Sequence, residues 1–154
     1  MAARLEYGKL APEGLARMRA LEHYLNTETG LEMVLLDLVR LRASLMNGCE
    51  YCIKLHTAEL RKLHEPEERI TALADWRGSG AYTQRERAAL TWCEAVTEIQ
   101  EGHAPDAAYE EVLAHFSEAE TVNLTLAITT INAWNRLAIA LGDYPGHAGG
   151  AVSS

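Results

Sequence analysis

Apolar residues recur at spacings of three and four along most of the chain, and this period constrains the fold more than any other feature. Leu15, Met18, Leu21 and Leu25 form one such stripe, and residues 122–141 form a longer one. No segment alternates apolar and polar residues between hairpin turns, as half-buried strands do. The pattern therefore predicts an all-α fold.

About six to eight helices are expected. After an extended start, Pro12 opens the first helix and Gly30 stops it. Later helices are expected over 31–46, 49–63, 65–76, 83–101, 105–115 and 122–141. The helix over 31–46 is apolar on much of its circumference, which predicts a central position. No linker or repeat interrupts the pattern, so we expect one domain over 1–154, with a disordered tail over 146–154.

Two of these helices carry a clear start signal. Thr83 is followed three residues later by Glu86, and Ser117 is followed by Glu120. In such a capping box each side chain bonds to the backbone N–H of the other residue. The sequence therefore predicts helix N-termini at Thr83 and Ser117.

Charge and composition exclude several kinds of partner. Apolar residues make up 48% of the chain, charged residues 23%, and the net charge is −8. An acidic chain lacks the basic face that binds phosphates, so neither nucleic acid nor an anionic membrane is an expected partner. No secretory leader or membrane span is visible, which predicts a cytoplasmic protein. In that compartment cysteines favour a redox, catalytic or metal role over a structural disulfide.

Two cysteines and a histidine gather at the start of the helix expected over 49–63. Cys49 and Cys52 are spaced C-x-x-C, and His56 follows Cys52 by one helical turn. With Cys49 in the first turn, all three side chains point to a similar side of the helix. The helix N-terminus favours a thiolate, which can attack a peroxide oxygen or a disulfide sulfur. The other cysteine can then close an internal disulfide.

The turn at Asn47-Gly48 adds a carboxylate to this group. If the helices before and after it form an antiparallel hairpin, residues equally far from the turn meet. His56 lies eight residues after Gly48 and Asp37 lies ten before Asn47. Asp37 could therefore hold one imidazole nitrogen of His56 and leave the other to exchange protons with a cysteine. This is the arrangement of an activated nucleophile.

Simpler interpretations stand beside this one. The two cysteines could be small buried core residues, or ligands of a zinc site completed by His56 and Asp37. Asp37 could merely pair with Arg40 or Arg42 on its own helix. Cys93 lies within an apolar stripe and is expected to be inert core packing. Three further residues could line a pocket or a subunit interface, and we expect them to serve packing and assembly: Trp134, Asn135 and Arg136.

The same residues resemble a known family. The segment 36–44 (LDLVRLRAS), the run 47–52 (NGCEYC) and His56 are similar to the core motif of alkylhydroperoxidase D-like proteins, in the carboxymuconolactone decarboxylase superfamily. Segments 83–90 and 131–137 resemble a common subgroup, and the resemblance covers roughly residues 7–146. It implies an all-helical bundle that forms trimers or hexamers.

The resemblance also implies roles for the site residues. The second cysteine of the motif, here Cys52, attacks the peroxide, and the first, Cys49, resolves the product. His56 and Asp37 match the family's histidine and glutamate. Asp37 is one methylene shorter than that glutamate, and Tyr51 stands where those members have a histidine. Tyrosine shuttles protons poorly near neutral pH. The shorter aspartate and the tyrosine are therefore both differences in the proton relay of the family.

The sequence therefore predicts a thiol-dependent peroxidase with catalytic residues Cys52, Cys49, His56 and Asp37. Its substrate would be a hydroperoxide, and its reductant an external dithiol protein or a small thiol. No cofactor and no metal are expected, and the protein should be a homo-oligomer. Open alternatives are a general disulfide oxidoreductase, a non-catalytic binding or sensor module of the same fold, and an enzyme acting on a lactone-type carbon acid. The branch with that last activity usually lacks the dithiol.

Overall fold

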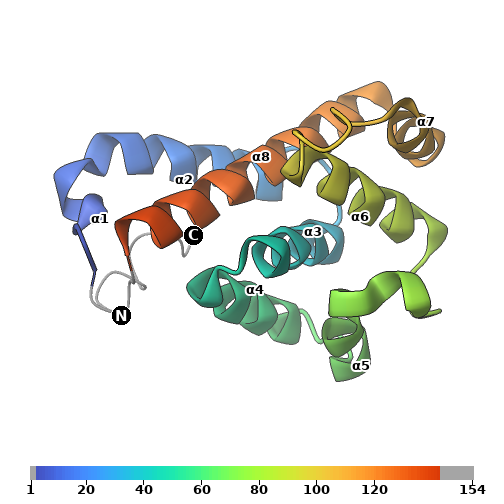
Figure 1. Ribbon diagram of the computed structural model, residues 1–154, viewed down its shortest axis with the longest axis horizontal. Coiled ribbons are helices and arrows are strands. Elements are labelled where there is room, and N and C mark those ends of the chain that lie inside the picture. Colours follow the sequence, from blue (N-terminus) through green and yellow to red (C-terminus); the bar gives the residue numbers. More distant parts are fainter. Residues whose placement is uncertain (1–2, 143–154) are drawn as a thin grey trace.

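The computed structural model describes residues 3–142, and within them it contains helices and no strand (Figure 1). The helices are α1 (Tyr7–Leu10), α2 (Pro12–Thr27), α3 (Met33–Asn47), α4 (Glu50–Lys62), α5 (Glu67–Thr71), the 3₁₀ helix η1 (Ala72–Gly78), α6 (Gln84–Thr97), α7 (Asp106–His115) and α8 (Glu118–Leu141). The predicted all-α fold is confirmed. The tail expected to be disordered, 146–154, lies outside the described residues. Among the described helices, none has the length and apolarity needed to cross a bilayer.

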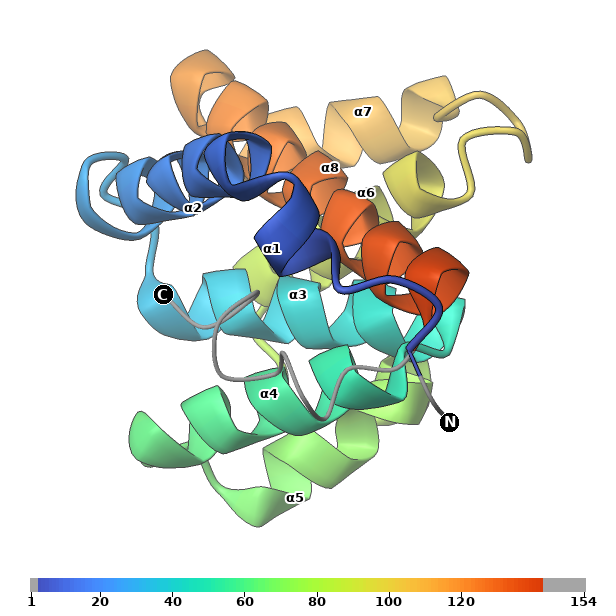
Figure 2. The same cartoon turned by 90° about the vertical axis from the view of Figure 1, so that its left-hand side faces the viewer.

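Helix α3 occupies the centre of the molecule. It packs against α4, α6 and α8, and Figure 2 shows it between α4 on one side and α8, α1 and α2 on the other. Leu36 and Val39 face the large core beneath α8, whereas Leu38 and Leu41 face a second cluster with α4 and η1. A helix that packs on both sides needs apolar residues around its circumference, which the segment 31–46 supplies.

Both predicted capping boxes are present. The Thr83 hydroxyl accepts a bond from the Glu86 N–H, and the Glu86 carboxylate accepts one from the Thr83 N–H. Ser117 and Glu120 form the same pair at the start of α8. These signals are local in sequence, so they fix helix starts without help from tertiary packing.

Three expected element bounds were wrong. The extended start contains the short helix α1, which forms because Tyr7 packs its ring into the core. The helix expected over 65–76 begins at Glu67, ends at Thr71 and continues as the 3₁₀ helix η1. The backbone leaves helical geometry at Asp75 of η1, and Leu73 and Trp76 on either side of that kink are both buried. The helix expected over 83–101 ends at Thr97, before a turn region that leads to α7.

Candidate active site

The turn between α3 and α4 positions the cysteine pair. Gly48 ends α3 with a left-handed φ of 70°, a conformation that glycine adopts at little cost. The Cys49 N–H then donates to the Ser44 carbonyl at 3.1 Å, which closes a Schellman-type helix end. Cys49 is therefore the N-cap of α4, one residue before the helical turn in which it was expected.

Cys49 and Cys52 are joined by a disulfide, with 5.3 Å between their Cα atoms. The Cys52 N–H also points at the Cys49 sulfur, at 3.4 Å. The cysteines are 1% and 0% exposed, and they pack against Ala138 of α8 and against Tyr51. The C-x-x-C pair therefore lies at the N-terminus of α4, where the helix dipole stabilises a thiolate once the bond is reduced.

Asp37 and His56 meet across the α3–α4 hairpin, as their distances from the turn predict. Asp37 Oδ1 lies 3.3 Å from His56 Nδ1, and both side chains are buried. The direct contact shows that the shorter aspartate reaches the imidazole without an extra methylene. The other nitrogen, His56 Nε2, is buried and has no hydrogen-bond partner within the described residues. That nitrogen is the one left to exchange a proton with a nearby group.

Two charged residues complete this cluster: Arg40, which the sequence offered as an alternative partner of Asp37, and Glu22, which sequence reasoning missed. Arg40 contacts Asp37 at 3.3 Å, so Asp37 has both the arginine and the histidine as partners. Arg40 also pairs with Glu22 of α2 at 2.8 Å. One signal was available, because Glu22 falls at the spacing of three and four that Met18 and Leu25 define. A carboxylate on the buried face of a helix is costly unless a cation pairs with it, so this position predicts a buried cation nearby.

A second polar network holds the turn from the side of α8. The Asn47 amide donates to Asn132 Oδ1 and Asn135 Oδ1, both at 2.9 Å. Asn135 in turn donates to the Ser44 hydroxyl at 3.1 Å, and Ser44 donates to the Arg40 carbonyl at 2.7 Å. Asn135 is fully buried, whereas Asn47 and Asn132 are half-buried. Side-chain amides satisfied in this way restrict the backbone that they bind. The network therefore fixes the last turn of α3, next to the cysteines.

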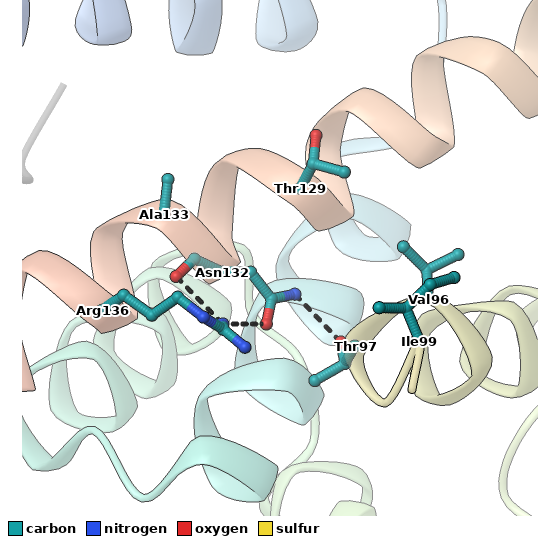
Figure 3. Close-up of a pocket in the computed structure, with 7 residues that line it drawn as sticks. All are labelled: Val96, Thr97, Ile99, Thr129, Asn132, Ala133 and Arg136. Carbon is teal, nitrogen blue, oxygen red and sulfur yellow. Dashed lines mark hydrogen bonds between the residues drawn. The ribbon is translucent and has the colours of Figure 1, made fainter. Parts of the chain in front are cut away.

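A shallow cavity of about 290 Å³ lies between the end of α6 and the outer face of α8 (Figure 3). Its lining residues are Val96, Thr97, Ile99, Thr129, Asn132, Ala133 and Arg136. The Arg136 guanidinium points at Asn132, whose amide donates to Thr97 and so ties α8 to α6. Of the three residues expected to serve packing and assembly, Arg136 lines this cavity, whereas Trp134 and Asn135 lie in the core.

Two other side chains have properties that limit their chemistry. Burial raises the pKa of Tyr51, so its phenol stays protonated beside the cysteines at neutral pH. Burial also raises the pKa of the Cys93 thiol to about 12, and its sulfur donates to the Val39 carbonyl. Cys93 is therefore inert core packing, as predicted.

The geometry bears on the zinc alternative. The two sulfurs that would be ligands are bonded to each other. Among the residues that the structure describes, no three histidine, cysteine, aspartate or glutamate side chains gather in a way that could hold a metal ion. What the structure places together is a disulfide and, one helical turn away, a buried histidine in contact with an aspartate.

Comparison with known proteins places these residues in a family. Residues 12–95 match the carboxymuconolactone decarboxylase family. The chain is 38% identical over 143 residues to the uncharacterized protein YdfG of Bacillus subtilis, which covers 93% of this chain and 97% of that protein. It resembles a crystal structure of a protein of unknown function from Agrobacterium tumefaciens, whose name suggests an AhpD-type antioxidant defence protein. That match has a TM-score of 0.87 and 44% identity, over 91% of this chain and 95% of the other.

A more distant structure supports the fold alone. It is an uncharacterized peroxidase-related protein from a Silicibacter species, with a TM-score of 0.76 and 22% identity. The match covers 87% of this chain and 71% of that one. The helical architecture is thus shared beyond the range in which the sequences are clearly similar.

Proposed function

Since the chain belongs to the carboxymuconolactone decarboxylase family, we propose that it is a thiol-dependent peroxidase that reduces hydroperoxides with the Cys49–Cys52 dithiol. The observation that carries the proposal is the cysteine pair at a helix N-terminus, one turn from a buried His56 that Asp37 holds. This arrangement supplies a nucleophile, a base and a group that orients the base. The name of the Agrobacterium relative, which suggests antioxidant defence, supports the same activity.

The first chemical step is oxidation of Cys52. Its proton passes to His56, and the thiolate attacks the terminal oxygen of the hydroperoxide, the one that carries hydrogen. The O–O bond breaks, the remaining oxygen takes the proton from His56, and it leaves as an alcohol, or as water when the substrate is hydrogen peroxide. Cys52 is left as a sulfenic acid. Asp37 stabilises the imidazolium that forms between the two proton transfers.

The second step closes the disulfide. The Cys49 sulfur attacks the Cys52 sulfenic acid, an S–S bond forms, and hydroxide leaves and takes the Cys49 proton to become water. An external dithiol protein or a small thiol then supplies two electrons and two protons and restores both thiols. The disulfide between these residues in the structure is the product that this cycle requires.

Burial of the sulfurs favours a small oxidant. Because Cys49 and Cys52 are almost inaccessible, a small hydroperoxide reaches them more easily than a bulky one does. We place this activity in the cytoplasm, where thiol reductants are kept reduced.

We also propose that the protein works as a homo-oligomer, a trimer or hexamer. The long helix α8 carries one charged residue between Thr121 and Leu141, and it exposes Val122 and Ile139 to solvent. Exposed apolar side chains near both ends of a long helix favour burial against another subunit. Light scattering coupled to size-exclusion chromatography tests this expectation, and a monomer at micromolar concentration would contradict it.

The activity is tested by counting thiols before and after peroxide. The reduced wild type should lose the Cys49 and Cys52 thiols. In Cys49→Ser, Cys52 should be trapped as a sulfenic acid, detectable by mass spectrometry, and Cys52→Ser should not react with peroxide. Cys93→Ala is the matched control and should behave like the wild type. If the wild type loses no thiol, or if Cys52→Ser reacts at the wild-type rate, the proposal is wrong. The first result would point to a non-catalytic module.

A further inference from the structure

Three helices contribute to a buried charge cluster behind the dithiol. Arg40 of α3 is 2% exposed and lies between Glu22 of α2 and Asp37 of α3. Asp37 contacts His56 of α4 through the oxygen that contacts Arg40. A chain of three contacts therefore connects α2 to the imidazole. Glu22 contacts Arg40, Arg40 contacts Asp37, and Asp37 contacts His56.

The Arg40 guanidinium is divided between two sets of partners. Its Nη2 donates to Asn26 Oδ1 at 2.7 Å and lies 2.8 Å from Glu22 Oε2, whereas its Nη1 donates to Asp37 at 3.3 Å. The shorter contacts are thus those to α2. Because a charge-assisted hydrogen bond weakens as it lengthens, Glu22 and Asn26 hold the guanidinium more closely than Asp37 does.

A count of formal charges shows what Glu22 adds. Asp37, Arg40 and a neutral His56 sum to zero, so a proton on His56 would leave them with one surplus positive charge. With Glu22 included, the four residues carry one surplus negative charge, which a protonated His56 neutralises. Buried charges are costly unless they are balanced. The cluster with Glu22 therefore accommodates the imidazolium that the reaction forms, whereas the cluster without it does not.

We propose that Glu22 is a positioning residue for the dithiol chemistry. By taking most of the interaction with Arg40, it leaves the Asp37 carboxylate for His56 and so supports proton transfer from the attacking cysteine. Glu22 acts through Arg40 and Asp37 and does not touch the sulfurs. The inference rests on the proposed function only for the peroxide reaction, because thiolate formation can be measured without peroxide.

The test compares Glu22→Gln with the wild type, because glutamine keeps the size and an acceptor oxygen and loses only the charge. The rate at which iodoacetamide alkylates the reduced dithiol reports thiolate formation, and we expect it to fall about tenfold. The low-field proton resonance of His56 Nδ1–H should move upfield. Without the charge of Glu22, Arg40 interacts more strongly with Asp37, so the hydrogen bond from His56 to Asp37 weakens. The matched control is Glu65→Gln, a carboxylate of similar burial that pairs with Arg69 away from the dithiol. It should leave both readouts unchanged.

A rescue separates charge from general damage to the fold. Asn26 lies one turn after Glu22 and binds the same guanidinium nitrogen, so the double variant Glu22→Gln/Asn26→Asp returns a carboxylate to Arg40 from an adjacent position. It should recover most of the alkylation rate. If Glu22→Gln does not fold, Asn26→Asp alone should accelerate alkylation.

The outcomes of these measurements test the role of Glu22 separately from the proposed peroxidase activity. An unchanged rate and resonance in a folded Glu22→Gln, or a double variant that stays slow, would overturn the proposal. So would an unaltered rate in Asn26→Asp, if that variant alone can be measured. A wild type that alkylates readily but ignores peroxide would instead overturn the proposed function, and the comparison of variants would still test the role of Glu22.

Discussion

The backbone N–H of Cys49 donates to the carbonyl of Ser44, so the residue that closes the end of α3 is also the residue that caps α4. The two helices thus share one turn, with no linker between them. The hairpin that brings Asp37 to His56 and the placement of the cysteine pair at a helix N-terminus both depend on this turn.

The turn depends on the left-handed conformation of Gly48, which gives a first prediction. Gly48→Ala should lower the free energy of unfolding by about 1 kcal/mol or more, because a Cβ is strained at this φ. The added atom meets nothing within 4 Å, so the cost is conformational and not steric. Urea unfolding measures it. Gly14→Ala is the control, because Gly14 is an exposed α2 residue with open space around it, and alanine there should stabilise the protein by about 0.5–1 kcal/mol. Equal effects of the two changes would contradict this account.

The parts of the fold that were predictable from sequence are those that local chemistry determines. Capping boxes at Thr83 and Ser117 act within four residues, and the depth of Asp37 and His56 in the hairpin follows from counting residues from Gly48. Helix α1 was missed because its four residues are too few to show a period. Its formation depends on Tyr7 packing into a core that distant segments build.

Only the contacts within the α3–α4 hairpin of the site were predictable from sequence. Asp37 was weighed as a partner of either His56 or an arginine on its own helix, and the structure gives it both His56 and Arg40. Glu22 could not be connected to them by counting, because the packing of α2 on the rest of the bundle decides which residues of α3 it meets. Long-range ion pairs of this kind depend on tertiary structure.

Removal of the carboxylate that orients His56 gives a second prediction. Asp37→Asn should slow oxidation of the reduced dithiol by peroxide at least about tenfold, because the amide cannot stabilise the imidazolium as a carboxylate does. Stopped-flow measurement of thiol loss provides the rate. Asp75→Asn removes an exposed carboxylate of η1 and should leave the rate unchanged. An Asp37→Asn variant as fast as the wild type would remove Asp37 from the mechanism.

The buried Cys93 thiol gives a prediction about pH. Its pKa is raised by burial from an ordinary value of 9.0 to about 12, so the folded chain keeps this proton after the unfolded chain has lost it. The stability that results is fully present below pH 9 and is lost as the pH rises from about 9 towards 12. In oxidised protein, where the other two cysteines do not titrate, the free energy of unfolding should fall by up to about 1.4 kcal/mol per pH unit from this thiol.

The matched variant isolates that contribution. Cys93→Ala lacks the thiol and should show a flatter decline of unfolding free energy over the same pH range, although it is less stable near neutrality because it leaves a small cavity. Tyrosine and lysine titrations affect both proteins equally and cancel in the comparison. Parallel pH profiles for the two proteins would show that the Cys93 thiol ionises in the folded chain as readily as in the unfolded one.

The last prediction concerns Asn135, which is fully buried and bonds to both Ser44 and Asn47. Asn135→Ala should cost about 2–3 kcal/mol of unfolding free energy, because it removes both hydrogen bonds of a buried amide and leaves a cavity. It should also speed reduction of the Cys49–Cys52 disulfide by dithiothreitol, since the turn beside the cysteines loses a support. Asn123→Ala is the control, because its half-buried amide has one such bond, to the Tyr24 hydroxyl. It should cost about 1 kcal/mol and leave the reduction rate unchanged. If Asn135→Ala lowers stability but leaves the reduction rate at the wild-type value, the network serves the helix packing alone and does not restrain the redox turn.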